Sequence, residues 1–392
     1  MKIAIVHDAF MQWGGAENLV LAMSELWPEA QIFTSVVNRN ILPPNFPLDR
    51  LNTSFIQNLP LSKKLYQPLF FLQPLAFEQM DLSSYDIVIS STTKFAKSII
   101  ASPNTLHICY CNTPTRILWF FQNYITQRAF NPISSLLAKY LLPPVISVLR
   151  THDYIAAQKV DYFIANSQNV AQRIQEIYHR QSNVIYPFVD LEKFRTYPSG
   201  GPNTAYYLIV SRLSGHKRVD VAINAFNQLG YTLKIIGTGS EEKKFRRLAK
   251  ANIKLLGRLP DNEVVEYYQS CKALIYPQEE DFGITALEAQ ATGKPVIAYR
   301  AGGALETVIE NKTGVFFTPQ TPAALIEAVK RFEQMKFNPR HCVNNAKQFS
   351  RDRFLKELSS FVYQKHQQSK TKSSRKVDER SKFGYTIPNN ND

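Results

Sequence analysis

The stretch KALIYPQEEDFGITALEAQATGKPVIAYR (residues 272–300) contains a strand, a helix and a second strand in succession. Its two ends, KALIYP and PVIAYR, are short apolar runs that are typical of buried strands. Between them, ITALEAQATG predicts a short helix that ends at its glycine, with a proline soon after. Continuous apolar strands separated by a helix indicate a parallel sheet that is covered on both faces.

The same alternation extends outward over most of the chain. At 392 residues the chain is long enough for two domains that each bury a core. Helical patterns separate six further predicted strands, which are IAIV (3–6), YDIVIS (85–90), LHICYC (106–111), DYFIANS (161–167), YYLIVS (206–211) and TLKIIG (232–237). We therefore predict an α/β fold in which both domains are doubly wound.

The segment NVIYPFVDLEKFRTYPSGGPNT (183–204) separates the two groups of strands, because its prolines and paired glycines break any regular pattern. Two doubly wound sheets joined in this way face each other across a cleft at the carboxyl ends of their strands. The predicted divisions are an N-terminal domain (1–190), a C-terminal domain (191–345), a helix that can cross back to the first domain (346–366) and a disordered polar tail (367–392).

The net charge is strongly positive, since 46 Lys and Arg residues oppose 32 Asp and Glu residues to give +14. This charge is compatible with nucleic acid, an anionic membrane surface or a phosphorylated substrate as partner. The basic residues are scattered, and no nucleic-acid recognition motif is recognised. We therefore expect no nucleic-acid partner and keep nucleic-acid binding as a remote alternative.

The cysteines predict neither disulfides nor a metal centre. The four cysteines form no disulfide framework and no C-x-x-C pair. His107, Cys109 and Cys111 alternate on one strand face and could in principle bind a metal. Buried strand residues are the favoured interpretation, so we expect no metal site.

Three loops carry groups that suit a diphosphate or a nucleoside. Arg212 and Lys217 follow a strand and can donate charge-assisted hydrogen bonds to a diphosphate, although a solvated basic loop is the favoured interpretation of such a pair taken alone. Gly237 and Gly239 follow the next strand and allow close backbone approach to a ligand, although simple turn geometry is the alternative. Arg258 follows another short strand and could border a nucleobase.

The opening stretch adds two carboxylates around a helix start. Glu280 is expected in the loop, and Glu288 about one turn inside the helix. Free backbone amides between them are expected at Gly283, Ile284, Thr285 and Ala286. This pattern suits a nucleotide sugar, with hydroxyls at both ends and a diphosphate between them. The alternative is that Glu280 complements the helix dipole and Glu288 is a surface residue.

At this point the sequence strongly resembles glycosyltransferase family 4, the retaining nucleotide-sugar enzymes of GT-B fold. The resemblance extends to about residue 366 and is closest to the mannosyltransferases that build O-antigen and exopolysaccharide. The pair of glutamates separated by seven residues is its most specific signal. The motifs that carry it include HDAFMQWGGAENLV, CNTPTRILW, SRLSGHKRVDVAINAF and EEDFGITALEAQATGKPVIAYRAGGALETVI.

The resemblance implies roles for four residues on the donor side. The family's diphosphate-binding Arg and Lys correspond to Arg212 and Lys217. Its first motif glutamate, which contacts the donor sugar, corresponds to Glu280, and the ribose-binding glutamate corresponds to Glu288. Arg212, Lys217 and Glu280 are thus the expected catalytic residues.

The resemblance also places residues of the N-terminal domain near the ligands. Gly14 and Gly15 correspond to the family's glycine loop beside the donor diphosphate and the acceptor. Asn112 stands where related sequences tend to carry His. Asp8, Asn112 and Arg116 are expected on the acceptor side, with loop hydrogen bonding or surface charge as the alternative for Asp8 and Arg116.

The implied reaction is hexosyl transfer (EC 2.4.1.-) with retention by front-face substitution, in which the departing phosphate takes the acceptor's proton. GDP-mannose is the favoured donor and a UDP-sugar the alternative, while the acceptor is a glycan or a polyprenyl-diphosphate-linked glycan of cell-surface polysaccharide synthesis. No cofactor is expected, because the sequence contains no D-x-D motif and Arg212 and Lys217 would replace the metal. The alternative, motivated by Asn112, is a noncatalytic nucleotide-sugar-binding protein.

The N-terminal domain also contains the stretch LSKKLYQPLFFLQPLAFEQM (61–80), which joins two lysines to Leu- and Phe-rich sequence. Such a combination favours contact with an anionic bilayer, and a core helix with a solvated basic edge is an equal alternative. The N-terminus has no signal-peptide core, so we expect a cytoplasmic protein, peripheral at the inner face of the plasma membrane if the bilayer hypothesis holds. Basic residues of the same domain are Lys63, Lys64, Lys94, Lys97, Arg116, Arg128 and Lys139.

Overall fold

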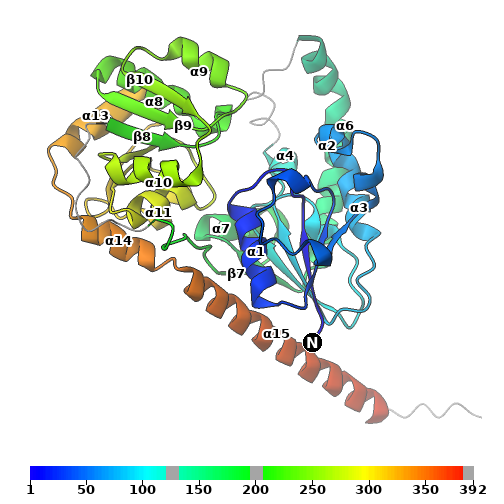
Figure 1. Cartoon of the computed structure of the whole chain (residues 1–392). Coiled ribbons are helices and arrows are strands. Elements are labelled where there is room, and N and C mark those ends of the chain that lie inside the picture. The colour runs from blue at the N-terminus through cyan, green and yellow to red at the C-terminus, as the bar shows by residue number, and fades with distance from the viewer. Residues whose placement is uncertain (121–131, 195–205, 383–392) are drawn as a thin grey trace, which may run out of the picture.

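The computed structural model describes residues 1–120, 132–194 and 206–382, so part of the predicted linker lies outside the described residues. Two parallel sheets, each with helices on both faces, form two domains that lie side by side (Figure 1). The prediction of a two-domain, doubly wound α/β fold is confirmed.

The N-terminal sheet has the strand order β3-β2-β1-β4-β5-β6-β7, and all of its neighbouring strands pair in parallel. Its central strands are entirely buried because both faces are covered by helices. The strands are Ile3–His7 (β1), Gln31–Thr34 (β2), Leu51–Thr53 (β3), Ile87–Thr92 (β4), Leu106–Cys111 (β5), Tyr162–Ala165 (β6) and Ser182–Val184 (β7).

The helices of this domain cover the two faces with separate apolar clusters. One face packs against α1 and α15, and the other against α3 and α6. The helices are Gly15–Leu26 (α1), Ser62–Leu65 (α2), Gln73–Glu78 (α3), Arg116–Trp119 (α4), Pro132–Gln158 (α6) and Gln168–Tyr178 (α7). Short 3-10 turns span Arg39–Ile41 (η1), Leu48–Arg50 (η2), Phe55–Asn58 (η3), Pro68–Leu72 (η4) and Ala96–Ser98 (η5).

The C-terminal sheet has the order β10-β9-β8-β11-β12-β13 and is also parallel throughout its described strands. Its strands are Tyr206–Val210 (β8), Thr232–Ile236 (β9), Ile253–Gly257 (β10), Leu274–Tyr276 (β11), Val296–Tyr299 (β12) and Gly314–Phe317 (β13). The connecting elements are Gly215–Lys217 (η6), Val219–Leu229 (α8), Glu242–Leu248 (α9), Asp261–Ser270 (α10), Ile284–Ala291 (α11), Ala304–Thr307 (α12), Pro322–Glu333 (α13) and Pro339–Lys347 (α14).

Local sequence signals set several helix boundaries. The Ser167 hydroxyl caps α7 by accepting from the Val170 amide, and Thr321 caps α13 in the same way just before a proline. Helix α8 ends at Gly230, whose φ of +74° is the left-handed conformation that favours glycine. The first two boundaries follow the carboxyl ends of β6 and β13, whereas the third precedes the amino end of β9.

Strand order reverses at one point in each sheet, between β1 and β4 and between β8 and β11. Open α/β sheets bind ligands outside the carboxyl ends of the strands at such a switch point. The loops that leave β8 and β11 carry Arg212, Lys217 and Glu280, and the loop that leaves β1 carries Gly14. The sheet topology therefore gathers the predicted site residues.

Helix α15 (Arg351–Lys382) runs from the C-terminal domain along the N-terminal domain (Figure 1). Its apolar residues Phe354, Leu358, Phe361 and Val362 belong to the core of the first domain. The predicted helix at 346–366 and tail from 367 are corrected here, because the helix begins at residue 351 and continues to Lys382. No glycine or proline interrupts residues 367–382, whereas both occur at 383–392, which lie outside the described residues.

Four short strands were not predicted from the sequence: β2, β3, β7 and β13. Each has only three or four residues. In β2 buried side chains alternate with half-buried ones, and the side chains of β3 and β7 are half-buried or exposed.

Among the described residues, no helix is both long enough and apolar enough to cross a bilayer.

Candidate active site

The two domains touch at the loops that leave β1 and β8. The Arg212 guanidinium donates a hydrogen bond of 2.7 Å from Nη1 to the Gln12 side chain of the other domain. A methyl group added at Gly15 would lie 2.6 Å from Cδ1 of Ile284, so the start of α1 packs directly on the start of α11. Of the residues predicted on the donor side, Gly15 and Ile284 are therefore in contact, and Arg212 reaches the loop that precedes Gly14.

Lys217 and Glu280 form an ion pair between the loops that leave β8 and β11. The lysine is almost buried, and Gln278 approaches the same carboxylate oxygen at 3.4 Å. Burial alone would raise the pKa of Glu280, but the ammonium of Lys217 and the nearby Arg116 outweigh it and hold the pKa below its usual value. Glu280 is therefore ionised at neutral pH.

Helix α11 begins at Gly283, which adopts φ +95°. A side chain there would be strained, and its Cβ would lie 2.6 Å from the Tyr276 hydroxyl. No described side chain caps this helix start, so the amides at Ile284 and Thr285 are available to an anion, while Ala286 is buried and its amide bonds to Gly283.

Glu288 lies inside α11, beyond the helix start. It accepts a hydrogen bond of 2.8 Å from the Tyr268 hydroxyl of α10. Burial raises the pKa of Glu288, and the bond from Tyr268 opposes that effect only in part. The two glutamates of the motif thus have opposite electrostatic environments.

Gly237 and Gly239 support the loop that carries Arg212. A Cβ at Gly237 would lie 1.9 Å from the carbonyl oxygen of Ser211, and one at Gly239 would lie 2.2 Å from that of Leu213. The close contacts require glycine at both positions whether or not a ligand binds. Arg258 is exposed just after β10.

The N-terminal domain holds the Glu279–Asp281 loop through two arginines. Arg116 pairs with one carboxylate oxygen of Asp281, and Arg173 of α7 donates to the other at 2.6 Å. Arg173 also donates to Glu279 at 2.8 Å. The position of Glu280 therefore depends on cations from the opposite domain.

A second contact between the domains lies beside this one. The Glu306 carboxylate accepts hydrogen bonds of 2.8 and 3.0 Å from the amides of Gln168 and Asn169 at the start of α7. The Ser167 hydroxyl donates to the carbonyl of Asp281 at 2.7 Å. Sequence reasoning missed Gln12, Arg173, Asp281 and Glu306, because no local pattern relates them.

His216 is a further neighbour of the site that sequence reasoning missed. Burial, together with the adjacent Lys217 and Arg116, lowers the pKa of His216 to about 4. Its Nδ1 lies 3.2 Å from the Ser214 hydroxyl. The imidazole is therefore neutral at pH 7 and adds hydrogen-bonding capacity without charge.

The carboxylate of Asp8, a residue predicted on the acceptor side, accepts all of the hydrogen bonds described below from its own domain. It is buried, and it accepts a hydrogen bond of 2.9 Å from the Thr93 hydroxyl. Its amide donors, at 2.5 to 2.9 Å, are the backbone N–H groups of Thr93, Lys94, Phe95 and Ala96. This geometry favours the alternative interpretation of Asp8, a loop hydrogen-bonding role.

Asn112 is also buried at the end of β5. Its amide group donates to the Ser91 hydroxyl at 3.1 Å, and its backbone carbonyl accepts from Asn166 at 2.9 Å. Nearby, His7 contacts the Ser91 carbonyl through Nδ1 at 3.2 Å. The Asn112 side chain is thus bonded within its own domain, as Asp8 is, whereas Arg116 pairs with Asp281 of the other domain.

The His107, Cys109 and Cys111 series is part of the sheet interior. Nε2 of His107 lies 2.8 Å from the Ser90 hydroxyl, and burial lowers its pKa to about 3. Burial raises the pKa of Cys109 to about 12. In the part of the chain that is described, no three or more His, Cys, Asp or Glu side chains gather in a metal-binding arrangement.

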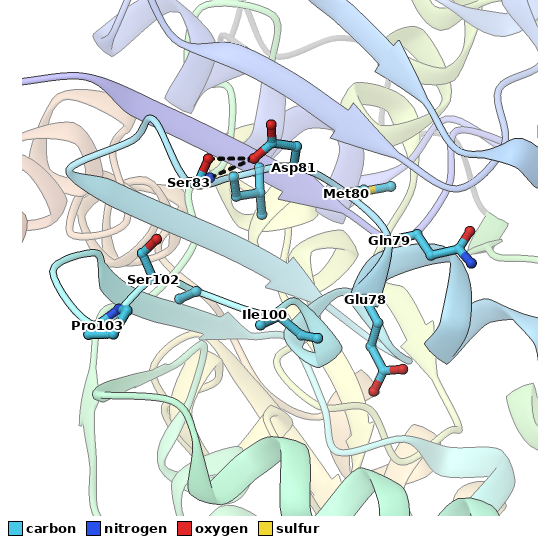
Figure 2. Close-up of a pocket in the computed structure, with 10 residues that line it drawn as sticks. Glu78, Gln79, Met80, Asp81, Ser83, Ile100, Ser102 and Pro103 are labelled. Atoms are coloured by element: carbon cyan, nitrogen blue, oxygen red, sulfur yellow. Dashed lines mark hydrogen bonds between the residues drawn. The ribbon is translucent and has the colours of Figure 1, made fainter.

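A separate hollow of about 440 Å³ lies at the other end of the N-terminal sheet (Figure 2). It is lined by residues 78–83 and 100–103, which precede β4 and β5. The Asp81 carboxylate accepts from the amide and hydroxyl of Ser83 at its rim. The hollow therefore lies at the amino ends of the strands, away from the loops described above.

Two family models match the chain in succession. Residues 13–193 match the model described as Glycosyltransferase Family 4, and residues 197–349 match Glycosyl transferases group 1. The boundary between them falls between the two sheets.

Curated relatives match about half of the chain. An uncharacterized glycosyltransferase of Methanocaldococcus jannaschii is 31% identical over 201 residues, which are 50% of this chain and 56% of that protein. The Alpha-1,3/1,6-mannosyltransferase ALG2 of Mus musculus is 24% identical over 260 residues, 57% of this chain and 58% of that protein. The matches thus span little more than half the length of these relatives.

Solved structures match nearly the whole fold. Sucrose-phosphate synthase from Thermosynechococcus elongatus has a TM-score of 0.69 at 16% identity, covering 93% of this chain and 99% of that chain. Anabaena HepE in complex with UDP-glucose has a TM-score of 0.64 at 17% identity, covering 93% of this chain and 100% of that chain. The two-domain arrangement is the GT-B fold.

Proposed function

The chain belongs to glycosyltransferase family 4, and from that premise we propose that it is a retaining hexosyltransferase (EC 2.4.1.-). It transfers a hexose from a nucleotide sugar to a glycan or a lipid-linked glycan of cell-surface polysaccharide synthesis. Within the family it belongs with the mannosyltransferases that extend such glycans.

The observation that carries the proposal is the Lys217–Glu280 pair, which joins the loop that carries Arg212 to the loop that leads into the start of α11. Cations and amides suit a diphosphate, whereas the Glu280 carboxylate suits sugar hydroxyls. Glu288, further along α11, suits the ribose hydroxyls. One strand, loop and helix therefore offer partners to each part of a nucleotide sugar.

In the proposed mechanism, Lys217, Arg212 and the α11 amides stabilise the charge that develops on the leaving diphosphate. The leaving phosphate accepts the acceptor's proton while the acceptor oxygen attacks the same face of the sugar, so the anomeric configuration is retained. Glu280 orients the sugar through its hydroxyls. The protein supplies position and charge, and no cofactor enters the proposal.

GDP-mannose is the proposed donor. A named mannosyltransferase among the relatives supports mannose, and the structure of HepE with UDP-glucose makes a UDP-sugar the competing choice. The exposed Arg258 is the residue that we propose to border the base.

The test is a thermal-shift panel of GDP- and UDP-sugars on the full chain, followed by product analysis with the donor that binds. We expect GDP-mannose to stabilise the protein most and to give an α-linked product with a lipid-linked glycan acceptor. Binding without turnover of labelled donor would favour the noncatalytic alternative that Asn112 suggests. Binding of none of the nucleotide sugars would remove the proposed function altogether.

A further inference from the structure

A buried ion pair inside the N-terminal domain has no part in the mechanism proposed above. Asp153 lies on α6 and Lys97 on η5, and both side chains are wholly shielded from solvent. Their Oδ1 and Nζ atoms are 2.5 Å apart. Burial alone would lower the pKa of Lys97, but the attraction of Asp153 outweighs it and raises that pKa. The lysine is therefore charged at neutral pH.

The burial of Lys97 corrects a prediction. The sequence placed it among the basic residues of an exposed face of this domain, but its ammonium lies inside the domain. Two other residues predicted on that face, Arg128 and the side chain of Lys139, lie outside the described part of the chain.

Asp153 also connects α6 to two other helices. Trp119, the last residue of α4, donates its indole N–H to Oδ2 at 2.8 Å. Tyr178, the last residue of α7, donates its hydroxyl to the same oxygen at 2.7 Å. The hydroxyl of Thr115, directly before α4, lies 2.8 Å from Oδ1. We call Lys97, Thr115, Trp119, Asp153 and Tyr178 the Asp153 cluster.

The Asp153 cluster pairs its buried charges fully. The remaining contacts of the Lys97 ammonium are the carbonyl of Lys94 at 2.8 Å and the hydroxyl of Thr115 at 3.2 Å. Desolvation makes a buried ion pair costly, and apolar residues of similar volume often give an equally stable protein. Stability alone therefore does not account for the charges. Directional bonds, unlike apolar contacts, fix the connected helices in one relative position.

The two helices that meet at the cluster carry the arginines that hold the loop around Glu280. Arg116, the first residue of α4, pairs with Asp281. Arg173 of α7 donates to Asp281 and Glu279, and its guanidinium lies 5.3 Å from the ring centre of Phe120 at the end of α4. A change in the angle between α4 and α7 would therefore move one arginine relative to the other.

Helix α7 is held at both ends. Its last residue bonds to Asp153, whereas the hydroxyl of Ser167, its cap, donates to the carbonyl of Asp281 in the other domain. The amides of its first two residues donate to the Glu306 carboxylate, also of the other domain. The helix therefore connects a buried carboxylate of the first domain to the loop that carries Glu280.

We propose that Asp153 is a positioning residue for the transferase reaction. It fixes α4 and α7 relative to each other, so that Arg116 and Arg173 hold Asp281 together and keep Glu280 in place against the sugar. The effect of Asp153 on catalysis rests on the proposed function. Its effect on the contact between the domains requires neither donor nor acceptor.

The first test removes single bonds to Asp153. Trp119→Phe and Tyr178→Phe keep an aromatic ring, and each should lower kcat/KM by about fivefold with the donor identified above. Tyr110→Phe is the matched control, because this buried hydroxyl of the same domain donates to the Ile185 carbonyl at 2.9 Å. All three variants should melt lower, but the control should keep normal kcat/KM. Equal losses of activity in all three would reduce the cluster to a role in stability and overturn the proposal.

Double variants identify the residues through which the cluster acts. The loss caused by Tyr178→Phe should largely disappear when Arg173→Gln is already present, and the loss caused by Trp119→Phe when Arg116→Gln is present. The reason is that each arginine is the residue through which the bond to Asp153 acts. Fully additive losses in both pairs would contradict the proposal.

A charge-free cluster tests the ion pair itself. Asp153→Asn with Lys97→Met leaves no unpaired buried charge, so we expect the double variant to fold. Its asparagine offers one carbonyl oxygen to donors that two carboxylate oxygens served, and kcat/KM should fall by about tenfold. A folded double variant with near-normal kcat/KM would show that Asp153 positions nothing.

Spin-label distances test the same role without any donor. Asp49→Cys and Lys243→Cys place one label at an exposed site of each domain, and the four native cysteines are buried. The distribution of distances between the labels should broaden in Trp119→Phe and Tyr178→Phe and stay unchanged in Tyr110→Phe. An unchanged distribution in both test variants would overturn the proposal. A broader distribution without turnover of any nucleotide sugar would keep Asp153 as the residue that fixes the contact between the domains and remove the proposed function.

Discussion

The two sides of the site treat their charged residues differently. On the C-terminal side, the side chains of Lys217 and Glu280 bond to each other and that of Arg212 bonds to the side chain of Gln12, and a ligand can replace such partners. On the N-terminal side, Asp8 is bonded to four consecutive residues of the loop that follows β4, and Asn112 is bonded to Ser91 of β4. The comparison indicates that the first group is arranged for an exchangeable partner and the second for holding loops in place.

The largest effect is expected at Lys217. Lys217→Met should lower kcat/KM by roughly 10²- to 10³-fold, because it removes a positive charge that would stabilise the leaving diphosphate. Product formation with the donor identified above is the measurement, and Lys243→Met, an exposed lysine of α9, is the control. Near-normal turnover would mean that the C-terminal side is not arranged for a diphosphate.

Asp8→Asn should act on stability instead. Its carboxylate accepts bonds from four buried or half-buried amides, so its loss should lower the free energy of unfolding by about 3 kcal/mol. Thermal melting measures this, and donor KM should stay unchanged. Asp81→Asn is the control, because Asp81 accepts hydrogen bonds from the amide and hydroxyl of Ser83 in an exposed position. A large change in KM with unchanged melting would reverse the assignment of the N-terminal side.

Arg173→Gln tests whether the N-terminal side positions Glu280. Arg173→Gln removes the bonds to Glu279 and Asp281, so the loop should hold Glu280 less precisely against the sugar. We expect kcat/KM to fall by roughly tenfold. Arg246→Gln removes a matched surface pair with Glu242 and should have little effect. Kinetics of Arg173→Gln that equal those of the control would show that the loop is held without the opposite domain.

The smallest effect is expected from pH and concerns the two glutamates. The raised pKa of Glu288 means that ionisation there lowers stability as pH rises through that pKa, whereas the lowered pKa of Glu280 adds stability that is lost only when pH falls through it. Donor affinity should therefore weaken on acidification as Glu288 is protonated, while Glu280 stays ionised. Calorimetric titration across the acidic range measures this.

Glu288→Gln is the variant that checks the pH prediction. It should remove most of the pH dependence, weaken the donor by about tenfold and melt slightly higher than the unmodified chain at neutral pH. A pH dependence that persists in the variant would place its origin elsewhere.

The sequence was most informative where neighbours in the chain are also neighbours in space. The unit from residue 272 to 300 contains strand, loop, helix and strand, so the location of Glu280 before α11 and of Glu288 inside it could be predicted. The central strands were found because both of their faces are buried. The short strands β2, β3 and β7 carry no comparable apolar run.

Contacts between the domains could not be predicted in the same way. Arg116 and Asp281 are 165 residues apart in the chain, and Arg173 and Asp281 are 108 apart. Isolated charges of this kind are usually solvated, and only the facing of the two sheets makes them partners. The bonding of Asp8 was likewise invisible, because its donors are backbone amides that any sequence provides.

Because helix α15 is synthesised last but packs on the first domain, that domain cannot complete its core until the end of synthesis. Phe354, Leu358 and Phe361 complete the core of the first domain, although they follow the whole second domain in sequence. The second domain therefore leaves the ribosome with its own core complete, while the first still exposes the apolar residues that α15 covers. The domain made first is the last to be finished, and during that interval its exposed apolar residues favour aggregation of the nascent chain.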